Sequence, residues 1–250
     1  MNENSFEKDI QKLTVRKANS MIQKSKMNLS LFEQRIINYM IAKIKPDDKT
    51  LDYITIDYNK FCKICRVNYN TNFVYVKQIV KKLYDKSWEL FDGKNYVPIK
   101  WLDDYIISEK AVKLKFHFRM QAFLIDVRKN FTETELFYYF QFQNKYSSVL
   151  YDYFFSYRNL TFKANNNKFE KTLTIDEFRE KIGLDVPDKN GKLKYPFFKD
   201  LRVNVLEPCI NEINLITNLN VELNFIKKGR KIDSIKFIIA LKDVSERIIL

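Results

Sequence analysis

Residues 195–239 hold a helical pattern followed by two strand patterns, and this order restricts the fold more than any other part of the chain. The helical part has one apolar stripe with a spacing of three to four, formed by Phe198, Leu201, Val205, Cys209, Ile213 and Ile216. From Val221 the spacing changes to two, which predicts two strands joined by a cationic turn at residues 227–231. A helix followed by a hairpin with a basic tip predicts a winged helix, whose helix enters a DNA groove while its wing contacts phosphates.

The overall charge agrees with a polyanionic partner. The formal net charge is +13 and the isoelectric point is about 9.4, which favours fast, salt-sensitive association with nucleic acid. A lysine-rich solvated surface gives the same totals, so the positions of the charges carry more information than their sum. The cations gather before and within the long helix and again in the predicted wing.

The two halves of the chain predict the same order of elements. In the first half, Ser30 and Glu33 form a capping box that opens a helix. The expected elements of this half are a helix over 31–45, a strand over 51–56, helices over 57–64 and 71–86, an extended segment over 88–91, and strands over 96–107 and 111–118. In the second half they are a helix over 145–158, a strand over 171–173, a capped helix over 174–183, and the helix and hairpin of 195–239.

This shared order predicts an α+β fold built from two tandem winged-helix domains. The expected boundaries are a partly ordered segment over 1–27, a first domain over 28–127 and a second domain over 128–250. Residues 131–142 fit a strand and a buried helix equally well.

Three segments resemble the replication initiators of iteron-containing, theta-replicating plasmids. They are KSKMNLSLFEQRIINYMIAKI near the amino terminus, NKYSSVLYDYF in the middle, and FKDLRVNVLEPCINEINLITNLNVELNFIKKGRKIDSIKFII. The last segment is similar to the carboxy-terminal signature of that family, including Glu212, Ile213, Asn214 and Thr217. The middle segment differs from the corresponding segment of that family at Asn144, because many relatives have serine before the lysine.

The resemblance implies a bacterial, cytoplasmic protein whose second domain binds direct repeats of double-stranded DNA at an origin. It implies that the first domain serves as the dimer interface and as a secondary DNA contact. Monomers of such proteins open the origin and recruit a host initiator or helicase, whereas dimers in equilibrium with them bind the protein's own operator and repress its promoter. No cofactor is implied.

Candidate DNA-binding residues follow from the expected elements. We expect Lys199, Arg202 and Asn204 to face base edges, where an arginine paired with guanine discriminates by about 1–3 kcal/mol. Lys192 and Lys194 precede the helix, and the expected phosphate contacts of the wing are Lys227, Lys228, Gly229, Arg230 and Lys231. In the first domain, Lys113 and Lys115 alternate with apolar residues, a pattern that a solvated strand face also explains. Pro208 is expected to bend the long helix near Asn204.

Enzymatic and metal-dependent functions are not expected. His117 is the only histidine, so the paired-histidine metal site of a rolling-circle nickase is missing, and the four glycines form no phosphate-binding loop. The acidic run at residues 46–49 lacks the separate strands of a nuclease site. Cys62 and Cys65 are one helical turn apart and are expected to pack in a core rather than bind metal. No stretch is apolar enough to span a membrane.

Two other functions share part of these features. A winged-helix transcriptional repressor without an initiation role would also carry a basic helix and wing. An adaptor would use the sheet of the first domain to bind a protein. The DNA upstream of the gene discriminates among them, because direct repeats beside an AT-rich tract favour an initiator, a lone palindrome favours a repressor, and neither favours an adaptor.

Overall fold

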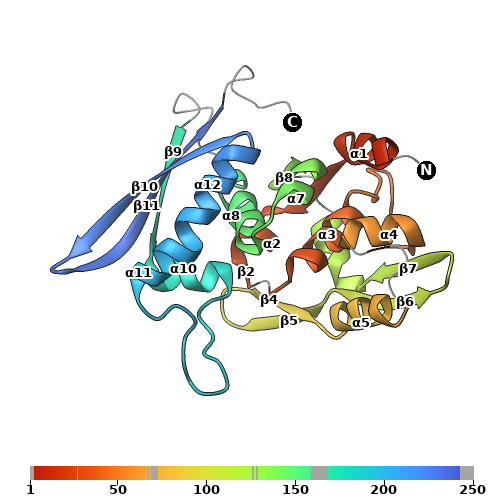
Figure 1. Ribbon diagram of the computed structural model, residues 1–250, viewed down its shortest axis with the longest axis horizontal. Helices are drawn as coiled ribbons and strands as arrows, with labels where there is room; N and C mark the ends of the chain where they lie inside the picture. Colours follow the sequence, from red (N-terminus) through yellow and green to blue (C-terminus); the bar gives the residue numbers. More distant parts are fainter. Residues whose placement is uncertain are drawn as a thin grey trace. The chain divides into compact units, whose positions relative to one another are not determined.

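The computed structural model describes residues 3–26, 28–66, 68, 73–125, 127, 129–158 and 168–242 (Figure 1). The chain forms two compact units. The first contains the residues up to Gln141 except 26–28, and the second contains residues 26–28 and those from Phe142 onward.

A three-stranded antiparallel sheet forms the centre of the first unit, with strand order β3-β7-β6. Its elements are α3 (Leu31–Ile41), β3 (Ile54–Asp57), α4 (Tyr58–Cys65), α5 (Phe73–Tyr84), β6 (Leu102–Ile107) and β7 (Ala111–Phe116). Local signals fix two of the helix starts, because Ser30 and Glu33 form the expected capping box and Asp57 caps α4. Fully buried residues from helices and strand, including Ile36, Phe61, Val80 and Leu114, form the core.

The second unit repeats this arrangement with strand order β10-β11-β9. Its elements are α8 (Lys145–Phe155), β9 (Lys168–Thr174), α10 (Ile175–Ile182), α11 (Phe198–Leu201), η2 (Arg202–Leu206), α12 (Glu207–Ile216), β10 (Leu219–Lys228) and β11 (Lys231–Leu241). Thr174 and Glu177 form the second capping box, and Gly183 ends α10 with φ +69°.

In both units the last strand lies between the other two strands of the sheet, and the helices fall at equivalent places in the order. The prediction of two tandem winged helices is therefore confirmed. The hairpin of β4 (Ser87–Phe91) and β5 (Tyr96–Lys100) is an insertion that only the first unit carries between its third helix and its last two strands.

The amino-terminal segment is more ordered than expected. It contains α1 (Glu3–Gln11), β1 (Thr14–Ala18), α2 (Asn19–Lys24) and β2 (Ser25–Lys26). β1 pairs along its whole length with β8 (Phe131–Glu135), and Arg16 forms an ion pair of 2.7 Å with Glu133 across this pair. Val15 is fully buried, and the segment belongs to the first unit as far as Ser25.

The boundary between the units also differs from the expected one. Residues 131–142 contain both a strand and a helix, because β8 is followed directly by α7 (Leu136–Gln141). Pairing of β8 with β1 and burial of Leu136 hold this segment in the first unit, so the units divide after Gln141 rather than after residue 127. The charged run at 128–130 resembles a linker in sequence but precedes a strand.

Two strand predictions are wrong in detail. The expected strand over 96–107 breaks at the buried Trp101, and its halves, β5 and β6, belong to different sheets. The expected strand over 111–118 ends at Phe116. Phe118 is 65% exposed in the short helix η1 (Phe118–Met120), which α6 (Gln121–Leu124) extends.

Among the described residues, no helix has both the length and the apolar character needed to cross a membrane.

Candidate nucleic-acid interface

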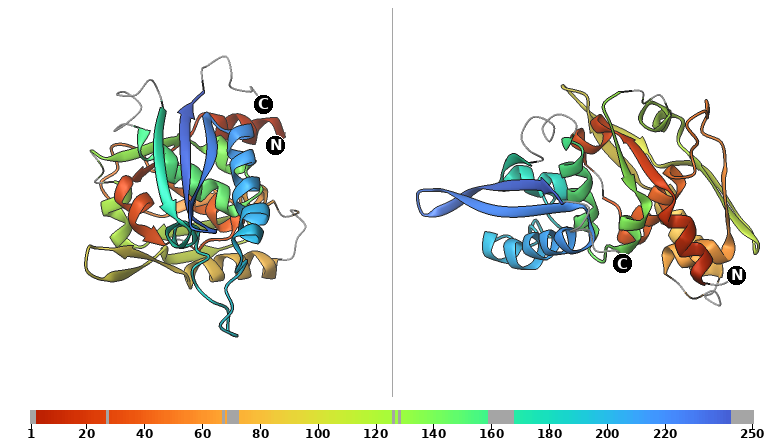
Figure 2. Two further views of the ribbon diagram at one scale, coloured as in Figure 1. Left: turned by 90° about the vertical axis from the view of Figure 1, so that its left-hand side faces the viewer. Right: turned by 90° about the horizontal axis from the view of Figure 1, so that it is seen from above.

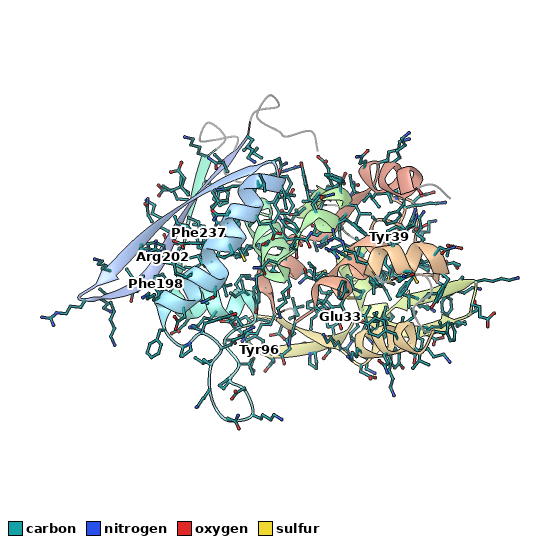
Figure 3. The ribbon with its side chains drawn as sticks, in the orientation of Figure 1. Glu33, Tyr39, Tyr96, Phe198, Arg202 and Phe237 are labelled. Carbon is teal, nitrogen blue, oxygen red and sulfur yellow. The ribbon has the colours of Figure 1, made fainter. Side chains whose placement is uncertain are left out.

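The long helix of the second unit runs without a break from Phe198 to Ile216 through α11, η2 and α12. Its inward row is fully buried and comprises Leu201, Val205, Leu206, Cys209 and Ile213. Lys199, Arg202 and Asn204 are all exposed on the outward side, as expected. Figure 3 labels Phe198 and Arg202 at the start of the helix, on the side where the β10–β11 hairpin lies.

A wide turn interrupts the regular helix where the bend was expected. η2 is a π-helical turn in which the Glu207 amide donates to the Arg202 carbonyl, five residues earlier. Pro208 has no amide hydrogen to donate to the carbonyl of Asn204, so the usual bond is lost at this point. The Asn204 side chain donates to the Asp200 carbonyl at 2.8 Å, which supports the backbone just before the turn.

Arg202 is held at the junction between the helix and the hairpin. Its Nε donates to Glu207 Oε1 at 2.6 Å, and its guanidinium carbon lies 4.7 Å from the ring centre of Phe225 on β10. Phe225 also packs edge-on against Phe198, with ring centres 5.5 Å apart. The Arg202 side chain remains 45% exposed, so it is oriented yet accessible to a ligand. The pairing of Arg202 with Glu207 was not expected from the sequence.

The hairpin presents the expected wing cations at its tip. Lys228 pairs with Lys231 across a two-residue turn made by Gly229 and Arg230. Gly229 has φ +64° and Arg230 does not have a positive φ, which matches a type II′ turn with glycine in its first central position. All five residues from 227 to 231 are exposed, and the hairpin extends past the helices of its own unit (Figure 2).

A bulge lies just below the tip of the hairpin. The register shifts between Ile226, which pairs with Ser234, and Lys227, which pairs with Ile232, so Asp233 is left as the extra residue. Bulges increase local twist and redirect the strand end. The side chain of Asp233 accepts a hydrogen bond from Ser234 at 2.6 Å.

The segment between α10 and α11 carries Lys192 and Lys194, both exposed. A side-chain oxygen of Asp188 accepts hydrogen bonds from the amides of Asn190 and Lys192 at 2.8 and 3.0 Å. This turn holds Lys192 although the segment has no regular secondary structure.

Arg179 organises the rest of this segment, a role that was not expected from the sequence. The residue is only 4% exposed, and its guanidinium donates to four backbone carbonyls, those of Leu184, Lys194, Tyr195 and Pro196. Three of these carbonyls lie just before α11, so one buried cation fixes the path into the long helix. The available signal was its place on the inward row of α10 with Ile175, Phe178 and Ile182, where a charged residue is unusual.

The first-unit candidates lie on its central strand. Lys113 is exposed and Lys115 is half-buried on β7, opposite the buried side chains of that strand. Lys115 Nζ lies 5.7 Å from the Tyr53 ring, and the Tyr53 hydroxyl donates to Asp104. The two lysines therefore belong to a mixed-charge face of the first unit.

The third helix of the first unit, α5, holds a more cationic surface. It is equivalent in chain order to the long helix of the second unit, and Lys77, Lys81 and Lys82 are exposed on it. Val74 and Tyr75 at its start are also exposed, at 54% and 43%. In the sequence these charges alternate with a strong apolar stripe, so the helix was not among the expected DNA-binding elements.

The cysteines pack in the cores. Cys62 and Cys65 on α4 are both buried and unpaired, and burial raises the pKa of both thiols. Burial likewise raises the pKa of Cys209 to about 12. In the part of the chain that the structure describes, no group of three histidine, cysteine or acidic side chains is placed to hold a metal ion.

Two family models match the chain. The model described as "Initiator Replication protein, WH1" matches residues 14–155, and "Initiator Rep protein, WH2" matches residues 174–239. No curated protein sequence matches at a significant level.

The fold is shared with a solved structure. The Pi initiator protein, crystallised in complex with iteron DNA, matches with a TM-score of 0.73 and 20% identity over 93% of this chain and 99% of that chain. Domains 2 and 3 of RctB match with a TM-score of 0.45 and 10% identity, over 86% of this chain and 83% of that chain.

Proposed function

The chain belongs to the initiator replication protein family, and we propose that it is a plasmid replication initiator that binds direct repeats, or iterons, at an origin. One observation carries the proposal. A single winged-helix unit holds an exposed polar helix start, a cationic segment before it and a cationic hairpin tip, and the contact of Arg202 with Phe225 joins helix and hairpin. The DNA in the Pi initiator crystal agrees with this assignment of ligand.

In the proposed complex, the start of the long helix occupies the major groove of one repeat. Lys199, Arg202 and Asn204 reach base edges there and select the sequence. The wing cations Lys227, Lys228, Arg230 and Lys231 neutralise phosphates, with Gly229 shaping the turn that presents them. Lys192 and Lys194 add phosphate contacts beside the helix, which raise affinity without selecting sequence.

The first domain is proposed to contribute a secondary DNA contact and the dimer interface. Lys77, Lys81 and Lys82 on α5 are the strongest candidates for the DNA contact, because α5 is the third helix of that winged-helix unit. Lys113 and Lys115 are the second candidates. Monomers of the protein would open the origin and recruit a host initiator or helicase, and dimers would repress its promoter.

Footprinting of the purified protein on its upstream DNA across a salt series tests the DNA-binding proposal. We expect regularly spaced protection over direct repeats. Arg202→Ala should lose sequence preference, whereas Arg230→Ala should lose affinity and reduce the salt slope by about 1. Protection of a lone palindrome would instead identify a repressor, and no protection at low salt would exclude DNA as the ligand of this surface.

Origin opening needs a separate measurement. Permanganate oxidation of unpaired thymines on a supercoiled plasmid carrying the repeats should increase in an adjacent AT-rich tract when the protein is added. Arg202→Ala should abolish the increase at concentrations where the wild type saturates the repeats. Protection of the repeats without any new reactivity would contradict the opening role and leave the DNA-binding role intact.

A further inference from the structure

An exposed apolar side chain lies at the centre of the outward row of the long helix. Val203 is 54% exposed, although Leu201, two residues before it, and Val205, two residues after it, are fully buried. Lys199 lies one turn before it and Glu207 one turn after it, both on the outward side. The neighbouring polar side chains are held by contacts within the helix, Arg202 to Glu207 and Asn204 to the Asp200 carbonyl.

Stability gives no reason for valine at this position. Its β-branched side chain loses rotamer freedom in a helix, and an exposed isopropyl group buries little surface in the folded chain. Single exposed apolar residues are common on protein surfaces, so exposure alone does not indicate a binding role. What distinguishes Val203 is its place among the side chains proposed above to contact base edges.

The major groove offers one apolar group for such a side chain. The 5-methyl group of thymine projects into this groove, and the other base edges present hydrogen-bond donors and acceptors there. We propose that Val203 is a specificity-determining residue that contacts a thymine methyl group within each repeat. This inference rests on the proposed function. It adds to that function the group on the DNA, the thymine methyl group, that an apolar side chain contacts.

Replacing thymine by deoxyuridine removes that methyl group while leaving the base pair and its hydrogen bonds unchanged. Wild type and Val203→Ala are titrated with one fluorescein-labelled repeat, as defined by footprinting, in its thymine form and with all thymines replaced by deoxyuridine. We expect the wild type to bind the uracil repeat about 3- to 5-fold more weakly, the contribution of one buried methyl group. Val203→Ala should bind both DNAs with the affinity that the wild type shows for the uracil form.

The comparison is a double-mutant cycle between protein and DNA. Effects of uracil on duplex shape are common to both proteins and cancel in it. Leu215→Ala is the matched control, because Leu215 is 60% exposed on the same helix but lies at its far end. That variant should keep the full uracil penalty.

Two results would overturn the inference in distinguishable ways. Specific binding of the repeat with an equal uracil penalty in wild type and Val203→Ala, or with no penalty in either, would reject the methyl contact while leaving the proposed function standing. Equal binding of the repeat and an unrelated duplex by the wild type would reject the proposed function, and the inference with it.

Discussion

Arg202 and Glu207 form a charged pair, with 2.6 Å between Nε and Oε1, across the π-helical turn of the long helix. In a regular α-helix, residues five apart point in directions about 140° apart, so this pair depends on the wider turn. Because Pro208 has no amide hydrogen, the helical turn widens at this point. The wider turn brings the carboxylate of Glu207 to Arg202, the residue that we expect to contact bases.

Glu207→Gln should make binding tighter but less selective. The substitution removes a negative charge beside the proposed phosphate path and releases the ion pair that orients Arg202. We expect affinity for an unrelated duplex to rise about 3- to 10-fold at low salt, with a smaller rise for the repeat. Parallel titrations of repeat and unrelated DNA measure the ratio.

Glu222→Gln is the charge-matched control for this experiment. Glu222 is exposed on β10, and its loss changes the net charge by the same amount. An equal rise for both variants would mean that net charge alone explains the result. Orientation of Arg202 by Glu207 would then be irrelevant to selectivity.

Arg179→Met should weaken DNA binding by loosening the segment that leads into α11. The substitution leaves the carbonyls of Lys194, Tyr195 and Pro196 without their buried donor, at a cost of about 1–3 kcal/mol in stability. We expect at least a 10-fold loss of affinity for the repeat. Fluorescence titration and urea unfolding measure the two effects.

Hydrogen exchange separates positioning from general destabilisation. In Arg179→Met, amides of residues 184–197 should exchange faster while those of the β10–β11 hairpin keep their protection. Arg179→Lys, which keeps the charge but has fewer donors in a different geometry, should show an intermediate affinity. Uniform loss of protection across the unit would contradict a local role.

Local sequence signals predicted the helices and the wing well. Both capping boxes, the glycine that ends α10 and the cationic hairpin tip lie where the spacing placed them. These features depend on residues within a few positions of one another. The repeated element order then gave the tandem fold, because each winged helix is itself a local sequence of elements.

Long-range pairing accounts for what the sequence did not reveal. β1 and β8 are more than a hundred residues apart in the sequence, and they pair with each other, as in the ion pair of Arg16 with Glu133. The local sequence of either strand does not identify the strand with which it pairs. The same reason explains Arg179, whose carbonyl partners at 194–196 lie well beyond its own helix. Glu207 was missed because an i to i+5 contact does not occur in a regular helix.

Gly229→Ala should reshape the wing at little steric cost. Gly229 has φ +64°, and a Cβ placed there would meet no atom within 4 Å, so strain of the left-handed backbone is the main penalty, about 1–2 kcal/mol. We expect the salt slope of DNA binding to fall as the tip cations shift, with sequence preference retained. Titrations of the repeat at several salt concentrations give the slope.

Gly93→Ala is the matched control for the wing variant. Gly93 also has a positive φ, +104°, and equally open surroundings, but it lies in the β4–β5 turn of the first unit. It should lose comparable stability and keep the wild-type salt slope. A slope that falls equally in both variants would show that destabilisation, rather than wing geometry, controls binding.

Lys181 on α10 is a half-buried lysine whose ammonium group lies against an aromatic ring. Burial lowers its pKa to about 8 from the ordinary 10.5, and the nearby Lys171 lowers it further while Glu180 opposes the shift. Its Nζ lies 4.8 Å from the Tyr153 ring centre, and burial of that tyrosine raises the pKa of its hydroxyl. Below pH 8 the lysine is charged in both the folded and the unfolded chain. The folded chain is therefore destabilised by the full free-energy cost of burying that charge.

Stability should therefore rise with pH between about 8 and 10.5, because over this range the unfolded chain retains a proton that the folded chain has lost. Lys181→Met should remove the cost, stabilising the protein at pH 7 by on the order of 1–3 kcal/mol, and the advantage over wild type should shrink as the pH approaches 10.5. Urea unfolding of both proteins at pH 7 and pH 10 measures this difference, and other titrating groups are common to the two. Lys168→Met, at an exposed position on β9, should show no such pH-dependent advantage. An advantage of Lys181→Met that stays constant from pH 7 to pH 10 would point to apolar packing rather than to a buried charge.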